Sequence, residues 1–169
     1  MSRERYLSLT TALFLAILVA LSTPARADDL TKSFAPSGVK SVLIESSLGN
    51  VTVNALEHGE ATVVAHKIAF DSGCELTIEQ VGAELRATSK EPKGLVKKCE
   101  VNFELAVPKN ATVKLRVGKG NATLAGLSGD ILTEIGAGDL AATKVQLKSL
   151  DGKTGAGNVK VDEIGRAHV

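Results

Sequence analysis

Aromatic side chains are almost absent from this sequence. Its 169 residues include four Phe, one Tyr and no Trp. Flat aromatic faces grip single-stranded nucleic acid by stacking, and Trp and Tyr supply many of the strongest contacts in protein interfaces. The shortage argues against nucleic-acid binding. It also predicts that any partner is contacted through backbone edges, small side chains or scattered charges.

The sequence also lacks an apolar run long enough to span a membrane. Its longest run, residues 12–21, has 10 residues, whereas a membrane span needs about 20. Arg3 and Arg5 precede this run, and Ala25-Arg26-Ala27 follows it with the small-x-small pattern of a cleavage site. We therefore predict a cleaved signal peptide over residues 1–27 rather than a membrane anchor. The remaining chain would be exported to the periplasm or the cell surface, with no stable membrane span.

Neither sign of charge predominates. Cleavage would remove three Arg and one Glu, so the 20 basic and 19 acidic residues become 17 and 18, a net charge of −1. A chain so balanced has no strong field, and electrostatic capture of nucleic acid or of an anionic membrane is not expected.

Cysteine is scarce, with only Cys74 and Cys99 in the chain. Each begins an alternating apolar stretch, so the two could meet at the same end of a sheet. An exported protein meets an oxidising environment, and an even count favours pairing. We predict a Cys74–Cys99 disulfide, against the alternative of two buried free thiols.

Helical periodicity is missing from every 12-residue stretch after residue 27. Apolar and polar residues instead alternate along 101–107 and 113–117, as in strands with one buried and one exposed face. The segments 76–78 and 85–87 predict a hairpin that turns near Gly82.

A glycine template recurs in the C-terminal part of the chain. It reads Gly, any residue, Gly, then Asp or Asn, and occurs at 118–121, 136–139 and 155–158. The second glycines lie 18 and 19 residues apart. Such a near-constant period indicates one short unit stacked on copies of itself. Each repeat would hold two short strands, and the expected core residues are Leu124, Ile131, Leu140, Leu147 and Val159.

The template suits a tight corner, because glycine reaches positive φ and Asp or Asn can bond nearby backbone amides. The predicted structural turn residues are Gly49, Asn50, Gly118, Gly120, Asn121, Gly129, Asp130, Gly136, Gly138, Asp139, Gly155, Gly157 and Asn158. Calcium-loaded β-rolls use a richer repeat, and calcium takes 6–8 oxygen ligands. Only one acid or amide follows each glycine pair here, so we predict structural turns, with no metal site and no cofactor.

These patterns predict an all-β protein, a β-solenoid or right-handed β-helix-like stack of short rungs preceded by longer strands, with a β-sandwich as the alternative. We expect a flexible lead-in over residues 28–38, a single repeat domain over 39–164, and a tail or truncation point at 165–169. A solenoid needs its last rung covered. The open edge after residue 164 therefore predicts either a fragment or pairing with something else.

The region 38–164 resembles the bacterial putative-adhesin domain of unknown function, a toast-rack-type β-solenoid repeat family. The resemblance rests on the strand ending at Val107-Pro108, the strand 113–117 and the opening segment 48–53. It also rests on the rungs at Gly120-Asn121, Gly129-Asp130, Gly138-Asp139 and Gly157-Asn158. It implies an exported or surface β-solenoid without established catalysis.

No catalytic residues are singled out. Gly126-Leu127-Ser128-Gly129 lacks the spacing of a nucleophile elbow, and the acids Asp130, Asp139 and Asp151 are all explained as turn residues. We therefore expect a non-enzymatic scaffold or adhesin-like binding module of the bacterial cell envelope, with an unknown macromolecule, a protein or an envelope component, as its partner. The alternative is a hydrolase or lyase that acts on polysaccharide along the solenoid.

Overall fold

The computed structural model describes residues 29–93, 98–146 and 148–163. The signal peptide at 1–27 with Ala25 and Ala27, and the tail at 165–169, lie outside the described residues. The elements in chain order are β1 (Asp29–Phe34), η1 (Pro36–Gly38), β2 (Ser41–Leu48), β3 (Val51–Leu56), β4 (Ala61–Phe70), β5 (Glu75–Val81), β6 (Glu84–Lys90), β7 (Cys99–Pro108), β8 (Thr112–Lys119), β9 (Ala122–Ala125), β10 (Asp130–Ala137), β11 (Leu140–Val145), β12 (Ser149–Ala156) and β13 (Val159–Glu163).

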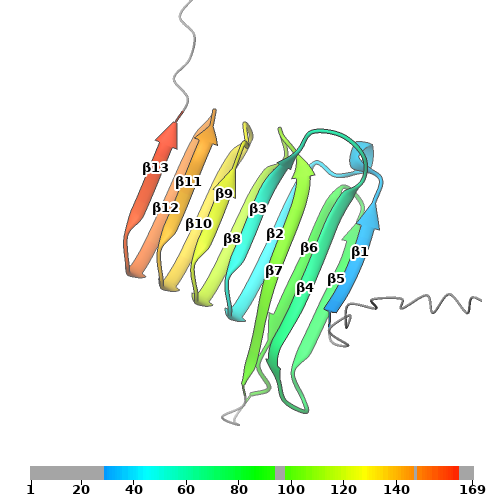
Figure 1. Ribbon diagram of the computed structural model, residues 1–169, viewed down its shortest axis with the longest axis vertical. Helices are drawn as coiled ribbons and strands as arrows, with labels where there is room; N and C mark the ends of the chain where they lie inside the picture. The colour runs from blue at the N-terminus through cyan, green and yellow to red at the C-terminus, as the bar shows by residue number, and fades with distance from the viewer. Residues whose placement is uncertain (1–28, 94–97, 147, 164–169) are drawn as a thin grey trace, which may run out of the picture.

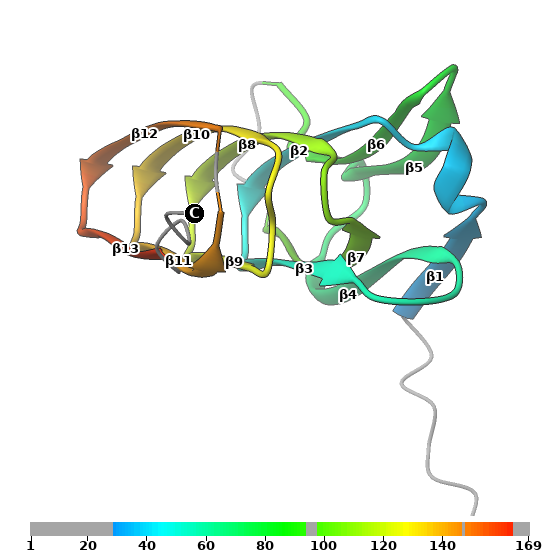
Figure 2. The same cartoon turned by 90° about the horizontal axis from the view of Figure 1, so that it is seen from above.

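From β7 onward, successive strands alternate between two layers (Figures 1 and 2). The first layer contains β2, β8, β10 and β12, and the second contains β3, β9, β11 and β13. Neighbours within each layer pair in parallel. One strand of each layer, joined by a corner, makes one rung. This arrangement confirms the predicted all-β solenoid-like stack, and its parallel pairing differs from an antiparallel β-sandwich.

Longer strands stand at the other end of the stack, as predicted. There β6 extends the first layer beside β2, and β7 extends the second beside β3, both in parallel. The ten-residue strand β4 adds to β7 in antiparallel pairing. The predicted hairpin is also present: β5 and β6 pair antiparallel and turn at Gly82, whose φ is +61°.

The core lies between the two layers and consists of inward-facing aliphatic side chains with one large aromatic, Phe103. Alternation places every second residue of a strand inside, so each rung adds a few side chains to a thin core. Leu124, Ile131 and Leu140 are buried, as expected. Val159 is not: it is 44% exposed, because its strand belongs to the last described rung and no further rung packs on it. Leu147 lies outside the described residues.

Residues 29–38 differ from the flexible lead-in that the sequence predicts. Residues 29–34 form β1, which pairs antiparallel with β4 from Asp29–His66 to Phe34–Ala61. His66 Nδ1 lies 2.9 Å from Asp29 Oδ2, and Lys32 Nζ donates to the Ile78 carbonyl at 2.6 Å. Pairing with β4 satisfies the backbone hydrogen bonds of this polar segment. The weak apolar pattern of the segment itself does not predict a strand.

The second glycine of each template and the Asn or Asp after it lie at the corners of the rungs. Gly49, Gly120, Gly138 and Gly157 have φ between +124° and +148°. A Cβ on Gly138 would also collide with the carbonyl oxygen of Gly120 in the rung before it, and Gly120 relates to Gly49 in the same way. These glycines are therefore required by conformation and by the close approach of stacked rungs.

The first glycine of each template lies within a strand, not in a turn. Gly118, Gly136 and Gly155 belong to β8, β10 and β12 and have no positive φ. A Cβ on Gly136 would come 2.5 Å from the carbonyl oxygen of Gly118, so close stacking alone explains them. Gly129 precedes β10 at a bend, and Asp130 is the first residue of that strand, where its Oδ1 accepts from Ser149 Oγ at 2.9 Å.

The side-chain oxygens of the corner Asn and Asp residues accept hydrogen bonds from the next rung. The sequence predicts instead that they bond backbone amides within their own turn. The backbone N–H of Asn121 donates to Asn50 Oδ1, that of Asp139 to Asn121 Oδ1, and that of Asn158 to Asp139 Oδ1, at 2.8–2.9 Å. The Asn50 N–H donates in the same way to Asn102 Oδ1 at 2.8 Å. The result is a ladder of side-chain acceptors along one edge of the stack, which we call the corner ladder.

Replacing Asn121 with alanine should lower the free energy of unfolding by about 1 kcal/mol, because the Asp139 N–H loses its acceptor at an exposed site where water substitutes in part. Urea unfolding followed by far-UV circular dichroism measures this. Asn54→Ala is the matched control, since Asn54 is equally exposed on β3 but lies outside the corner ladder. Equal effects of the two substitutions would remove the ladder's stabilising role.

Candidate functional site

The two outer faces of the solenoid differ in the side chains that they display. On the first layer, strand register aligns Glu45 of β2 with Arg116 of β8, then Glu134 of β10 and Lys153 of β12. These four residues form a row of alternating charge across the strands, which we call the charged row. On the second layer, most outward positions of β3, β9 and β11 hold small side chains, namely Thr52, Asn54, Thr123, Ala125, Ala141 and Thr143, with the exposed Lys144 near the end of β11.

Ion pairs join three of the four members of the charged row, whereas Lys153 Nζ lies 3.9 Å from Asp151 Oδ2 on its own strand. Arg116 Nη1 lies 3.2 Å from Glu45 Oε1, and Arg116 Nε lies 3.9 Å from Glu134 Oε2. Lys90 of β6 approaches the other oxygen of Glu45 at 3.7 Å. Arg116 and Glu134 are about two-thirds exposed, and ion pairs this exposed contribute little to stability. The row is therefore a surface feature open to contacts from outside.

A strip without side chains runs beside the charged row. It consists of Gly118, Gly136 and Gly155, the first glycines of the three templates, next to Ser47 of β2. The strip and the row together form an open groove of ≈ 720 Å³ across the strands. Its floor is backbone and its wall is charged, so a ligand there would meet peptide groups on one side and alternating charges on the other.

A second hollow, of ≈ 400 Å³, lies on the opposite side of the charged row. Leu43 and Leu132 line it together with Lys114, and Leu132 is 44% exposed. Glu84 stands at its margin, where its Oε1 accepts from Arg86 Nε at 2.7 Å and raises the pKa of that guanidinium. The face thus combines apolar contact area with charges of both signs, and we call the two hollows and the charged row the charged face.

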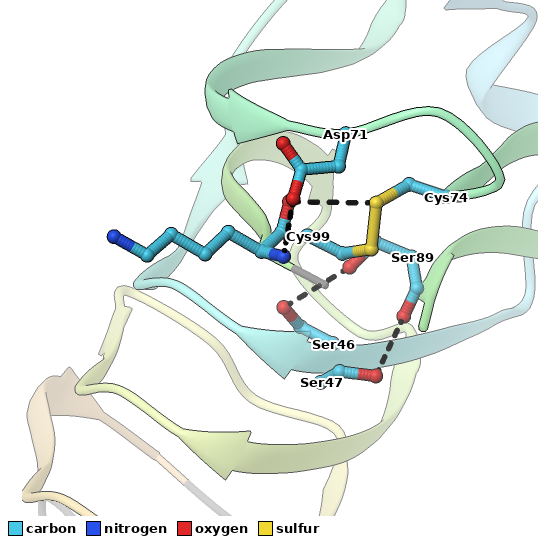
Figure 3. The surroundings of a disulfide bond; sticks show 7 residues. Ser46, Ser47, Asp71, Cys74, Ser89 and Cys99 are labelled. Atoms are coloured by element: carbon cyan, nitrogen blue, oxygen red, sulfur yellow. Dashed lines mark hydrogen bonds between the residues drawn. A yellow bond between two sulfur atoms is a disulfide. The ribbon is translucent and has the colours of Figure 1, made fainter. Parts of the chain in front are cut away.

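The predicted Cys74–Cys99 disulfide is confirmed (Figure 3). Cys99 is fully buried at the start of β7, close to the point where Leu48 of β2 pairs with Glu100. Cys74 lies in the turn before β5. The bridge ties the β5–β6 hairpin to β7, and Ser46 and Ser89, which line the groove, face each other nearby with their hydroxyl oxygens 3.3 Å apart.

The predicted turn residues do not gather into a chemical site. Four of them, Asn50, Asn121, Asp139 and Asn158, build the corner ladder, and the glycines allow rungs to stack. The charged row was missed by sequence reasoning. Its signal is present: each member stands two residues before the first glycine of its template, or before Ser47 in the opening rung.

Within the described ranges, no group of three His, Cys, Asp or Glu side chains is placed to hold a metal ion. The same residues contain no helix with the length and apolarity to cross a membrane.

Comparisons with known proteins give structural likenesses only. No protein-family model matches the chain, and no curated protein sequence does. A putative cell adhesion protein from Clostridium sporogenes aligns over 80% of this chain and 99% of its own, with 10% identity and a TM-score of 0.48. A putative lipid binding protein from Parabacteroides distasonis aligns over 82% and 68%, with 16% identity and a TM-score of 0.40. A putative adhesin from Parabacteroides merdae aligns over 80% and 82%, with 11% identity and a TM-score of 0.29. We take no function from likenesses at this level.

Proposed function

We propose that this protein is an exported, non-enzymatic binding module of the bacterial cell envelope that holds a protein partner on its charged face. The observation that carries the proposal is the asymmetry between the two outer faces. The central strands β3, β9 and β11 of one face display mostly small side chains, whereas the other face carries the charged row, the groove of ≈ 720 Å³ beside it and the exposed Leu132. A structural role alone gives no reason for such a concentration.

The chemistry of the charged face suits a polypeptide better than a sugar or a nucleic acid. It has no aromatic side chain on which a base would stack. It offers carboxylates, guanidinium and ammonium groups in alternation, with leucines beside them, and complementary charge is a common source of specificity between proteins.

One form of the competing function, hydrolysis of a polysaccharide, typically uses a pair of carboxyl groups that act on one bond. The two acids of the charged row, Glu45 and Glu134, instead lie on either side of Arg116 and each pairs with it. That arrangement supports a binding role for these acids.

Export is supported by the Cys74–Cys99 disulfide, because such bonds persist in oxidising compartments and are rare in the cytosol. Together with the predicted signal peptide, it supports a location in the periplasm or at the cell surface.

Site-specific photocrosslinking in cells tests the proposal. A photoreactive amino acid at Leu132 should capture a defined protein partner, whereas the same amino acid at Thr123, on the opposite face, should not. Adding Arg116→Glu should lower the yield at Leu132 by at least about tenfold, since reversing an interface charge typically costs a few kcal/mol and each 1.4 kcal/mol is a factor of about ten. Circular dichroism would verify that the charge-reversed chain stays folded. Equal yields from the two faces, or no adduct from either, would refute the proposal.

A further inference from the structure

The two outermost strands of the last described rung are unpaired on one side. Within residues 29–93, 98–146 and 148–163, β12 hydrogen-bonds only to β10 and β13 only to β11. Figures 1 and 2 show both strands at the same extremity of the solenoid. Such edges carry rows of free N–H and C=O groups that readily pair with another chain.

The core is also open at this extremity. Val159 and Val161 are 44% and 42% exposed, whereas Leu140 and Ala142, which pair with them in β11, are buried. At the opposite extremity β1 and β5 also pair on one side only, but the core between them is covered: Lys32 of β1 reaches across to the carbonyl of Ile78 in β5, and Ile78 is buried. The last described rung, which we call the open rung, therefore combines unpaired backbone with uncovered inward-facing valines, whereas the inward-facing Ile78 at the other end is buried.

The outward charges on the two open strands are self-complementary only in antiparallel pairing. Asp151 and Lys153 flank Gly152 on β12, and Lys160 and Asp162 flank Val161 on β13. A second copy turned by a two-fold axis and centred on Gly152 places Lys153 of that copy opposite Asp151. Centring on Val161 likewise places Asp162 of the copy opposite Lys160. Parallel pairing in register would instead place each side chain opposite one of the same charge, which destabilises a strand pair.

We propose that this open rung is a dimer interface, at which a second copy of the chain pairs antiparallel with β12 and β13 about a two-fold axis. The pairing is isologous, since the same strands meet their own copies, and it therefore closes after two chains and does not grow into a fibre. It covers Val159 and Val161 and satisfies the free edges. Lys153 belongs both to the charged face and to this edge, whereas Asp151, Lys160 and Asp162 lie outside the charged face, so the Asp151 and Asp162 substitutions test the dimer separately from the function proposed for that face.

Mass measurement of the purified full chain by light scattering tests the interface. The unmodified chain should have twice the mass of one 17.6 kDa chain, or twice that of the cleaved form. Asp151→Lys with Asp162→Lys makes both strands cationic, and Lys153→Asp with Lys160→Asp makes both acidic. Each double variant should be a monomer, and an equimolar mixture of the two should recover the dimer. That recovery also shows that both variants are folded.

Cysteine crosslinking tests the register. Chains carrying Asp151→Cys and chains carrying Lys153→Cys should form a disulfide-linked pair when mixed, and neither should do so alone. Crosslinking of the Asp151→Cys chain with itself would indicate parallel stacking. That result would overturn the proposal, and so would a monomeric unmodified chain or an equimolar mixture that stays monomeric.

Discussion

Replacing Gly138 with alanine should lower the free energy of unfolding by about 3 kcal/mol. Two costs combine at this corner. The φ of +141° is strained for a residue with a Cβ, and the new methyl group meets the backbone carbonyl of Gly120, which no side-chain rearrangement can avoid. Relief requires the rungs to separate, and separation uncovers core side chains. The chain has no Trp, so urea unfolding followed by far-UV circular dichroism is the suitable measurement.

The control for Gly138 is Gly82→Ala in the β5–β6 turn. Gly82 also has positive φ, +61°, but a Cβ there meets nothing within 4 Å, so only the conformational cost of about 1 kcal/mol is expected. Gly157→Ala should fall between the two, because the last described rung can move outward. Equal effects at Gly82 and Gly138 would show that close stacking of the corners is unimportant.

Reducing the Cys74–Cys99 disulfide should lower the free energy of unfolding by about 3.5 kcal/mol. The bridge closes a loop with a sequence separation of 25, and the loop-entropy relation gives this value for a loop of that length. Urea unfolding of the same chain with and without reductant measures the difference without any substitution.

A Cys74→Ala/Cys99→Ala variant is the control for the reduction experiment, because its unfolding should not respond to reductant. If reduction changes the stability of the unmodified chain by less than about 1 kcal/mol, the unfolded chain is not appreciably constrained by the bridge. The β5–β6 hairpin would then be held in place mainly by the parallel pairing of β6 with β2 and by hydrogen bonds such as Lys32 Nζ to the Ile78 carbonyl.

The solenoid was predictable because its signal is repeated. Each glycine template alone is weak, but three copies spaced 18 and 19 residues apart fix the rung length. β1 was not predictable, because only Leu30 and Phe34 of its six residues are even partly buried. Its structure comes from pairing with β4, a partner that local sequence does not specify. Val159 was misjudged for a related reason: its burial depends on a neighbour that its own pattern does not contain.

The charged row was missed because charge changes sign from one repeat to the next. Within a single repeat, Arg116 or Glu134 is an ordinary exposed strand residue. Alternation becomes visible only when the repeats are aligned on their glycines, since strand register then brings Glu45, Arg116 and Glu134 into one line. The inter-rung bonds of the corner ladder were missed likewise, because a side chain beside a turn is normally expected to bond within that turn.

Each corner presents the same two groups to the next rung. One is a glycine carbonyl that the next corner glycine contacts closely, and the other is a side-chain oxygen that accepts from the next backbone N–H. Units of 18 or 19 residues therefore make the same contacts with their neighbours. Duplication of one such unit would lengthen the solenoid by one strand spacing, about 4.8 Å, without a new type of contact. A deletion that shifts a corner relative to its neighbours would place a residue with a Cβ where the stacked backbone needs glycine. Duplication or loss of whole units would thus change the length of the solenoid in fixed steps, whereas small insertions are tolerated only between the corners.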